Sequence, residues 1–400
     1  MDDTGTYWYH SHVGSQYTEG LWGVLIVHPK NHITSKNQIP EIVLTVSDWY
    51  HKSAHENEKW LWTPETKGVP PFPSTLLFNG MGRFPCPKIS DFRRFCSIKR
   101  QRRPVFHVEK EKYYKIRLIN TSGYAAFNFT IEGHKLIIIE VDGVDIKNVT
   151  TEALEIGAGQ RYTFLVYTNM HYNESRSLIR ANLKQEYLFT LPNLNVNKIP
   201  EASFTEVFAV LEYSTGKLLR EKSFELFDYQ AKSPKPLNWS SLEFLREGDL
   251  VALDGQIAPK YFDKQFVLNI SFIFDKNEMR RGTFNKIPFN FGPGDEPLLH
   301  RMAHQNISTH ESWVFTEFND VVQVVINNPM LGAHPIHLHG HHFWVMGQGK
   351  TGDGSYDPKV HKLQNNGYRR DTILVKEASW LVIRFKADNV GIWSLHVRKA

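Results

Sequence analysis

The densest group of potential metal ligands is a histidine-rich stretch near the C-terminal end of the chain, HPIHLHGHHF at residues 334–343. Five of the 19 histidines fall within these ten positions. Imidazole nitrogens bind zinc, copper, iron and nickel, so the residue type alone does not identify the metal. Because burying several imidazoles on one short segment is costly without a common partner, the stretch predicts a metal centre.

Two further places carry histidines with the spacing of metal ligands. WYHSHVG contains His10 and His12, and the segment WSLH ends at His396. On a β-strand, residues i and i+2 project from the same face, so His10 and His12 can converge on one metal ion or on two adjacent ions. By the same rule we expect His337, His339 and His341 to share one strand face, with His334 lying beyond a proline.

Strands are the elements expected to position these histidines, because alternation of apolar and polar residues dominates the chain. The alternating segments are YYKIRLIN (113–120), FNFTIEGHKLIIIEVDG (127–143), RYTFLVYT (161–168), FVLNISFIF (266–274), VVQVVINN (321–328) and WLVIRF (380–385). Only short helices are expected, at 150–156 and 240–247. Many short strands separated by Gly, Pro and Asn clusters predict an all-β fold of sandwiches or barrels.

The composition indicates a globular protein, with 41% hydrophobic and 22% charged residues. A net charge of +5 is small for 400 residues and gives no reason to expect nucleic acid as a partner. No apolar run approaches the roughly 18 residues of a membrane helix, and MDDTGTYWYH lacks the apolar region of a signal peptide. Cys86 and Cys96 are close enough in sequence to allow a local disulfide but do not require one.

Seven N-x-S/T sequons favour a secreted, glycosylated protein. They begin at Asn120, Asn128, Asn148, Asn173, Asn238, Asn269 and Asn306. A secreted type of sequence without a secretory start leads us to expect that the natural protein begins further upstream. The length predicts two or three domains, with boundaries near 31–40 and 220–238, where polar residues and prolines gather.

Two of the histidine motifs resemble copper-binding signatures of the multicopper oxidases, the family of laccases, ascorbate oxidases and fungal ferroxidases. GTYWYHSHVGSQYTEGLWGVLIV is similar to the second signature, and HPIHLHGHHFWV is similar to the third. The resemblance spans nearly the whole chain. It extends to VLTVSDWYH (43–51), LLFNGMGRFPC (76–86), YKIRLINTSGY (114–124), IIEVDGV (138–144), IGAGQRYTFLV (156–166), GYRRDTILV (367–375) and NVGIWSLH (389–396).

The resemblance implies tandem cupredoxin-like Greek-key β-sandwiches, three in a complete family member. Residues 1–32 are then the end of the first domain, 38–220 the second domain and 235–400 a third domain that stops within the fourth copper signature. The family carries four copper ions. A type 1 copper accepts single electrons from a small-molecule reductant or Fe(II), and a type 2/type 3 trinuclear cluster reduces O₂ to water. The implied protein is a secreted or cell-surface monomer.

The resemblance also implies a role for each histidine in the matched motifs. His341 and His342 fall outside the ligand set, and His341 is expected to be a supporting structural group. The remaining histidines are expected to be the type 3 ligands His10, His12, His339 and His396, the type 2 ligand His337, and the type 1 ligand His334.

The chain departs from the family pattern at two places. Val397 stands where the resemblance places the type 1 cysteine, and its aliphatic side chain has no lone pair for copper. The first H-x-H-G signature, expected several tens of residues before His10, is not matched. We therefore expect the chain as written not to turn over, because it lacks the thiolate through which electrons enter.

Three interpretations stay open. Valine and arginine codons can together spell GTAAG, with which many introns begin, so residues 397–400 are interpreted as the translated start of an intron and Met1 as an internal methionine. The alternative is a catalytically inactive, copper-binding remnant on a cupredoxin scaffold. A zinc hydrolase is disfavoured, because such an enzyme would be expected to have carboxylates among the residues that coordinate zinc, and the histidine motifs contain none.

The reducing substrate depends in part on Glu132, in FTIEGHKL. The resemblance places it at the acidic position near the type 1 histidine, where a glutamate favours Fe(II) and an aspartate favours phenols. Ferroxidases carry a further carboxylate just before the third signature, where this chain has Met330. Oxidation of phenols or aromatic amines is therefore expected ahead of Fe(II), with ascorbate third. The alternative for Glu132 is an exposed strand residue without a role.

Overall fold

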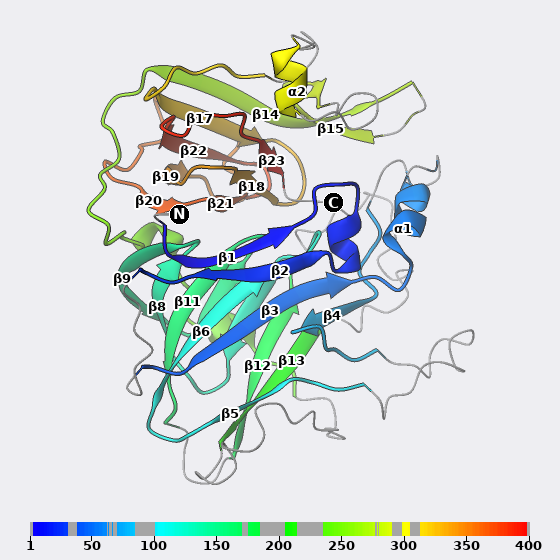
Figure 1. Ribbon diagram of the computed structural model, residues 1–400, viewed down its shortest axis with the longest axis vertical. Coiled ribbons are helices and arrows are strands. Elements are labelled where there is room, and N and C mark those ends of the chain that lie inside the picture. The colour runs from blue at the N-terminus through cyan, green and yellow to red at the C-terminus, as the bar shows by residue number, and fades with distance from the viewer. Residues whose placement is uncertain are drawn as a thin grey trace.

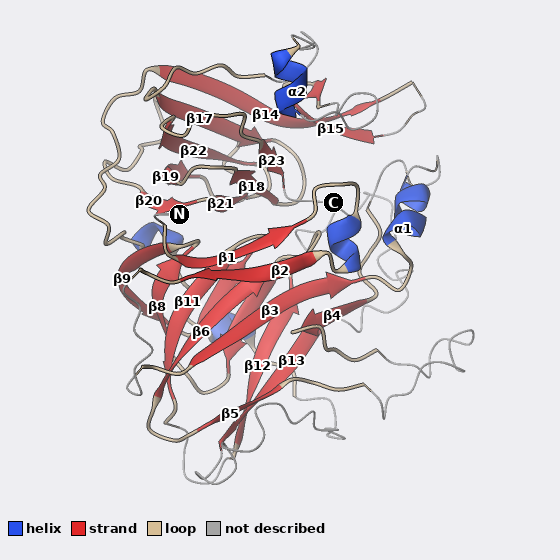
Figure 2. Ribbon diagram, viewed as in Figure 1, coloured by secondary structure: helices blue, strands red, loops and turns tan. Residues whose placement is uncertain are grey.

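The computed structural model describes most of the chain and is built mainly of β-strands (Figure 2). It describes residues 3–30, 38–61, 63, 66, 70–84, 101–169, 175–184, 205–213, 235–276, 278, 280–289, 298–304 and 313–397. The prediction of an all-β fold is confirmed. Cys86 and Cys96 lie outside the described residues, so the question of their pairing stays open.

Helices are few and short in the described part of the chain. The two α-helices there are α1 (Ala54–Leu61) and α2 (Leu298–Ala303). The expected helix at 150–156 is wrong, because that segment belongs to two edge strands, one paired with Leu136–Val141 and the other with Phe127–Ile131. In place of the helix expected at 240–247, two 3₁₀ turns occupy Trp239–Ser241 and Glu247–Asp249. No helix in the described ranges is both long and apolar enough to cross a membrane.

The middle of the chain forms two mixed sheets that pack face to face. The six-stranded sheet has the order β4-β3-β6-β11-β8-β9, and the five-stranded sheet has the order β10-β7-β12-β13-β5. Phe129 of the second sheet packs against Phe78 and Phe164 of the first, with ring centroids 6.3 and 5.8 Å apart. The strands are β3 (Glu41–Trp49), β4 (Thr75–Phe78), β5 (Val105–Val108), β6 (Tyr113–Asn120), β7 (Phe127–Ile131), β8 (Leu136–Val141), β9 (Val144–Thr151), β10 (Ala153–Ile156), β11 (Arg161–Tyr167), β12 (Arg176–Leu183) and β13 (Glu206–Tyr213).

The C-terminal part of the chain forms a second pair of sheets. One has seven strands in the order β16-β15-β14-β17-β22-β19-β20, and the other has three in the order β21-β18-β23. The strands are β14 (Lys264–Phe274), β15 (Arg280–Phe284), β16 (Ile287–Pro288), β17 (Val321–Asn328), β18 (His334–Leu338), β19 (Phe343–Gln348), β20 (Tyr368–Arg370), β21 (Thr372–Val375), β22 (Ser379–Lys386) and β23 (Leu395–Val397).

Parallel neighbours interrupt the otherwise antiparallel sheets. β3 pairs in parallel with β6, β5 with β13, and β14 with β17. Parallel strands require a crossover connection, because a tight hairpin can join only antiparallel strands. Such crossovers fit a Greek-key sandwich, in which non-consecutive strands lie side by side.

The N-terminal hairpin lies between these two bodies (Figure 1). It consists of β1 (Gly5–His10) and β2 (Trp22–Val27), with His10 opposite Trp22. The polar face of β6 is covered where β1 crosses it, so Arg117 is only 6% exposed and donates a hydrogen bond to Thr6 on β1. Strand alternation alone would have placed this arginine on a solvent-facing surface.

Candidate metal centre

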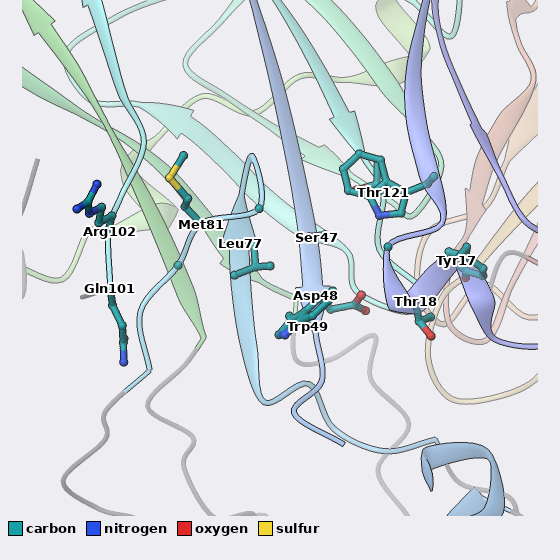
Figure 3. A pocket seen from close by; sticks show the side chains of 14 residues that line it. Tyr17, Thr18, Ser47, Asp48, Trp49, Leu77, Met81, Gln101, Arg102 and Thr121 are labelled. Carbon is teal, nitrogen blue, oxygen red and sulfur yellow. The ribbon is translucent and has the colours of Figure 1, made fainter. Parts of the chain in front are cut away.

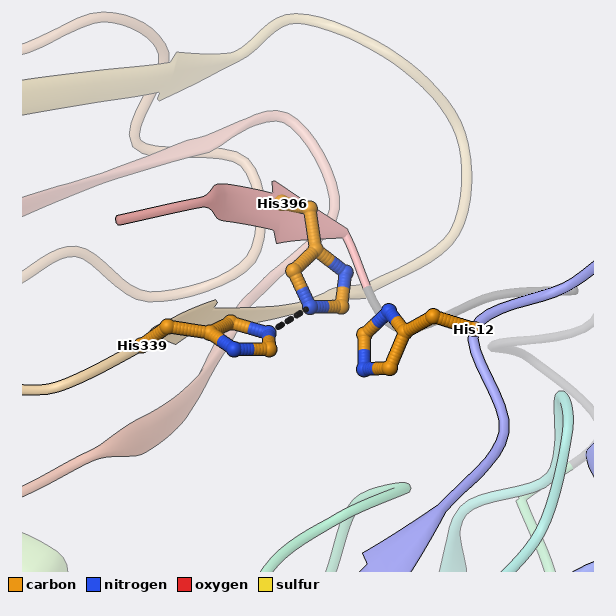
Figure 4. A group of neighbouring side chains, drawn as sticks. All are labelled: His12, His339 and His396. Carbon is orange, nitrogen blue, oxygen red and sulfur yellow. Dashed lines mark hydrogen bonds between the residues drawn. The ribbon is translucent and has the colours of Figure 1, made fainter. Parts of the chain in front are cut away.

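Three histidines from distant parts of the chain converge at one point (Figure 4). His12, His339 and His396 each present a ring nitrogen, and these three nitrogens all lie within 4.8 Å of one another. The ring of His12 lies 5.0 Å from that of His339 and 5.5 Å from that of His396, measured between centroids. Three imidazoles so close together form a set of donors suited to a transition metal.

The strand pairing of the C-terminal body explains two of these positions. β18 and β23 are antiparallel, and His337 lies directly opposite His396. Residues opposite each other in an antiparallel pair point to the same face, and their rings lie 5.8 Å apart at right angles. His339 follows the end of β18, and its ring lies 4.8 Å from that of His337. The pairing of β18 with β23 therefore brings these three imidazoles together.

The N-terminal hairpin supplies the other two histidines. His10 is the last residue of β1, and His12 follows it in the loop. Their rings stack 4.5 Å apart, and Trp8 stacks on the other side of His10 at the same separation. Together with the C-terminal group they make a cluster of five histidines, which we call the histidine cluster: His10, His12, His337, His339 and His396.

Hydrogen bonds to backbone carbonyls orient several of these rings. Nδ1 of His337 lies 2.8 Å from the carbonyl oxygen of Asp371, and Nδ1 of His10 lies 2.9 Å from that of Ser11. A carbonyl can only accept, so each Nδ1 carries the proton and each Nε2 keeps its lone pair for a metal. Nε2 of His339 and Nε2 of His396 lie 3.0 Å apart, a geometry that needs a proton or a metal ion between the two lone pairs.

Asp371 is a residue of this site that motif reasoning did not single out. Burial raises the pKa of Asp371, but the Arg161 guanidinium and His337 outweigh burial and hold the pKa well below 3.8. The carboxylate is therefore charged at the edge of the histidine cluster. The signal that could have identified it is the RRDT segment, whose acidic residue precedes a buried strand.

His334 lies on the opposite face of β18 from the histidine cluster, where it is 2% exposed and its ring lies 6.3 Å from Phe272. Val397 pairs with Ile336 across β18 and β23. Ile336 is two residues from His334, so Val397 and His334 share one face and lie diagonally across the strand pair. The half-buried Val397 side chain packs against the apolar core.

The expectation that His341 shares a strand face with His337 and His339 is wrong. β18 ends at Leu338, before His339 and His341, and the chain turns at Gly340, whose φ of +71° favours glycine. A Cβ at Gly340 would lie 2.5 Å from the ring of Trp393. His341 then packs against Trp393 and Phe385, with ring centroids 6.0 and 5.3 Å apart.

Glu132 follows β7 and forms an ion pair with the buried guanidinium of Arg180. Arg180 also contacts Glu206 at 3.2 Å. Burial raises the pKa of Glu206, and the nearby Glu132 carboxylate raises it further, although Arg180 acts in the opposite direction. Glu132 is therefore one of two carboxylates that share a single arginine.

A cavity of about 620 Å³ opens beside the N-terminal hairpin (Figure 3). Tyr17, Trp22, Asp48 and Trp49 contribute to its wall. The ring of Tyr17 lies 5.0 Å from that of His10, so the wall of the cavity contacts the histidine cluster through Tyr17. Burial raises the pKa of Asp48, which accepts hydrogen bonds from three successive backbone N–H groups at residues 123–125. These bonds identify Asp48 as a structural group.

Comparison with known families agrees with the fold. Three family models described as multicopper oxidase match residues 1–32, 40–213 and 275–399. The L-ascorbate oxidase of Cucumis sativus is 30% identical over 430 residues, which cover 99% of this chain and 70% of that protein. The chain belongs to the multicopper oxidase family, whose members are copper-dependent oxidoreductases.

Other relatives and solved structures support the same assignment. The iron transport multicopper oxidase FET3 of Gibberella zeae is 29% identical over 408 residues, which cover 99% of this chain but only 58% of that relative. The structure of Fet3p, a multicopper oxidase that functions in iron import, superposes with a TM-score of 0.77 at 24% identity and covers 99% of this chain and 69% of its own. A laccase from Botrytis aclada superposes with a TM-score of 0.71 at 25% identity, covering 99% and 67%.

Proposed function

We propose that the histidine cluster binds copper and belongs to the oxygen-reducing centre of a multicopper oxidase. The observation that carries this proposal is the convergence of His12, His339 and His396 on one point from both ends of the chain. His337 and His10 adjoin it with their Nδ1 atoms on backbone carbonyls, so that Nε2 is the donor atom. In family terms, His337 serves type 2 copper, and the other four histidines serve type 3 copper.

The whole protein is proposed to couple four one-electron oxidations of a reductant to the reduction of O₂, with four protons, to two waters. Bound copper supplies the electron storage for this reaction. The chain's own residues hold that copper, and the neighbouring side chains restrict their movement. The charged carboxylate of Asp371 lies 3.6 Å from Nδ1 of His337 and offsets the positive charge that collects at such a site.

Electron entry is the step for which this chain lacks a residue. We propose that His334 is a type 1 ligand and that residue 397 is the position of its partner thiolate. Val397 offers no donor atom, so the chain with valine here is proposed to bind copper at the histidine cluster without oxidising a reductant through His334. The second candidate function, a copper-binding remnant, rests on the same observation.

The nature of the reductant is a finer proposal. Phenols and aromatic amines remain ahead of Fe(II), because Arg180 places a buried positive charge between Glu132 and Glu206. A guanidinium that already pairs with both carboxylates opposes binding of a further cation there. Glu132 is proposed to lie near the reductant, with its carboxylate held by Arg180.

The domain division and the location of the protein are also proposals. The division 1–32, 38–220 and 235–400 follows the two sheet pairs and the N-terminal hairpin, with the boundaries in segments outside the described residues. A secreted or cell-surface location is supported by sequons with exposed asparagines, at Asn148, Asn238 and Asn269. Asn120 does not support it, because its amide is buried and donates to the carbonyls of Ala125 and Ile156.

Metal loading of the purified chain tests the proposal. The metal-free chain is titrated with Cu(II) and, separately, with Zn(II), and bound metal is measured after gel filtration. We expect copper retained at the histidine cluster and displaced only weakly by zinc, since Cu(II) exceeds Zn(II) in affinity for nitrogen ligands. Oxygen uptake with a phenol or Fe(II) as reductant is expected to stay at background. Retention of zinc alone would overturn the proposal.

A further inference from the structure

One buried arginine joins the two chain segments that carry the histidine cluster, although it contacts none of the five histidines. Arg161, at the start of β11 in the middle body, is 2% exposed. Its Nε donates to the backbone carbonyl of Thr6 at 3.0 Å. Its two terminal nitrogens donate to the two carboxylate oxygens of Asp371 at 2.6 and 2.7 Å. A planar guanidinium can make these three bonds at once because its donors form a fixed fork.

Two of the partners of Arg161, Thr6 and Asp371, lead directly to part of the cluster. Thr6 lies on β1, the strand that ends at His10. The backbone carbonyl of Asp371 accepts from Nδ1 of His337. The hydroxyl of Thr372 donates to the Asp371 carboxylate at 2.7 Å and lies 3.0 Å from the same Nδ1. Arg161 is therefore connected to His337 through Asp371, and to His10 through Thr6 and the rest of β1.

No ladder between the two histidine-bearing strands occurs among the described strand pairs, where β1 pairs with β2 and β18 pairs with β21 and β23. Besides the direct ring contacts of His12 with His339 and His396, contacts through the middle body hold the two strands relative to each other. Thr6 is fully buried, its backbone N–H donates to Glu140, and its hydroxyl accepts from Arg117. These bonds fix β1 on the middle body, while the bidentate pair with Asp371 fixes the C-terminal body to the same residue, Arg161.

We propose that Arg161 is a positioning residue for the copper centre, which sets the N-terminal pair of histidines at the correct distance from the C-terminal three. The proposal rests on the proposed copper site but concerns a residue that binds no metal. It also assigns Asp371 a second task, since its carboxylate is held by Arg161 while its carbonyl fixes the protonated nitrogen of His337. Loss of the Arg161 guanidinium therefore removes the bond to Thr6 on β1 and the bonds to Asp371 at the same time.

The neighbouring Arg370 provides a matched control. It is fully buried like Arg161, and both arginines contact Asp142, Arg161 at 3.6 Å and Arg370 at 2.8 Å. The other described hydrogen bonds of the Arg370 side chain run to Tyr162 and Glu247. Arg370 therefore joins the same two bodies without bonding Thr6 or the Asp371 carboxylate. A purely structural role predicts the same consequences at both arginines.

The test compares Arg161→Lys with Arg370→Lys, because lysine keeps the charge but cannot make the three bonds of the fork. Three quantities are measured in each variant: the free energy of unfolding in urea, the affinity for Cu(II) by competition with a chelator, and the tautomer of His337 in the metal-free chain. The tautomer comes from ¹⁵N NMR of histidine-labelled protein, with the His337 signals assigned from a His337→Gln variant.

We expect Arg161→Lys to weaken Cu(II) binding by about 10- to 100-fold, the usual effect of removing an outer partner of a metal ligand. His337 should change from a single Nδ1–H form to a mixture. Arg370→Lys should lose stability but keep Cu(II) affinity within about threefold and keep the His337 tautomer. Equal loss of affinity in the two variants, or none in Arg161→Lys, would overturn the proposal.

Two further results separate this proposal from the copper assignment. If the unmodified chain binds no copper, the proposed function fails, while the His337 tautomer in the two metal-free variants still decides the positioning role. If Arg161→Lys does not fold, Asp371→Asn replaces it, since asparagine keeps the backbone carbonyl but cannot accept from both guanidinium nitrogens. An unchanged His337 tautomer in Asp371→Asn would then overturn the proposal.

Discussion

His337 and His396 lie directly opposite each other on neighbouring strands, and their rings meet at right angles with centroids 5.8 Å apart. This register decides the use of both faces of the β18–β23 pair. One face carries His337 and His396 of the histidine cluster, and the other carries His334 and Val397. A slip of one residue would exchange the two faces, so the strand pairing assigns each residue to one of the two proposed copper sites.

The histidine cluster should lose copper when one of its inner members is changed. We expect His339→Gln to weaken Cu(II) binding by at least about tenfold, because its ring nitrogen is one of the three that converge. The matched control is His361→Gln in the same body, where the ring stacks on Trp380 and accepts from the backbone N–H of Asp357. Chelator competition measures both affinities, and equal losses would contradict the assignment of the cluster.

A cysteine at position 397 should create a second metal site. Val397 shares a strand face with His334, so Val397→Cys places a thiolate beside a buried imidazole. We expect Co(II) to produce a thiolate charge-transfer band in Val397→Cys that the unmodified chain lacks. Co(II) is used in place of Cu(II) because Cu(II) would oxidise the thiol. Val397→Ser is the control. The unmodified chain and Val397→Ser both retain Cys86 and Cys96, so a band from these two thiols would appear in all three proteins. An unchanged spectrum in Val397→Cys would show that residue 397 does not face the site of His334.

Glycan occupancy should follow the exposure of each asparagine. In a chain secreted from a eukaryotic host, we expect glycans at exposed Asn148 and Asn269 and none at Asn120, which is fully buried and hydrogen-bonded through its amide. Mass spectrometry of peptides after enzymatic glycan release in heavy-oxygen water measures each site separately. A glycan on Asn120 would contradict the described packing of β6, since the sugar has no space there.

Acid should remove the contribution of Glu41 to stability. Burial raises the pKa of Glu41, but hydrogen bonds from Arg117 and Lys115 outweigh it and lower the pKa from 4.5 to about 2. The folded state therefore favours the carboxylate, and this stabilisation is complete above pH 4.5 and is lost as the pH falls toward 2. We expect Glu41→Gln to lower the free energy of unfolding by about 1–2 kcal/mol at pH 7, allowing for partial exposure.

Urea unfolding at several pH values between 3 and 7 measures this contribution. The difference between the unmodified chain and Glu41→Gln should shrink steadily below pH 4.5. Glu58→Gln, on the exposed side of α1, serves as the control and should leave the free energy of unfolding unchanged throughout. A difference that stays constant down to pH 3 would show that Glu41 stabilises the fold by packing and not by charge.

The histidine motifs and the strand alternation were sufficient to predict the family and the all-β fold. His10, His12, His339 and His396 could be proposed as one group because the motifs that contain them resemble the copper signatures of the family. Copper as the family cofactor followed from the same segments. The YYKIRLIN and VVQVVINN segments coincide with β6 and β17.

Other features depended on contacts between distant segments and were decided by the tertiary structure alone. His341 leaves the strand face because Gly340 turns the chain against Trp393, which lies on a different segment. Glu132 pairs with Arg180 because β7 and β12 are neighbours in one sheet. Arg161 gains its position because Thr6 and Asp371 approach it from opposite ends of the chain. Local periodicity specifies which face of a strand is buried, whereas the partner of a buried charge is set by non-local packing.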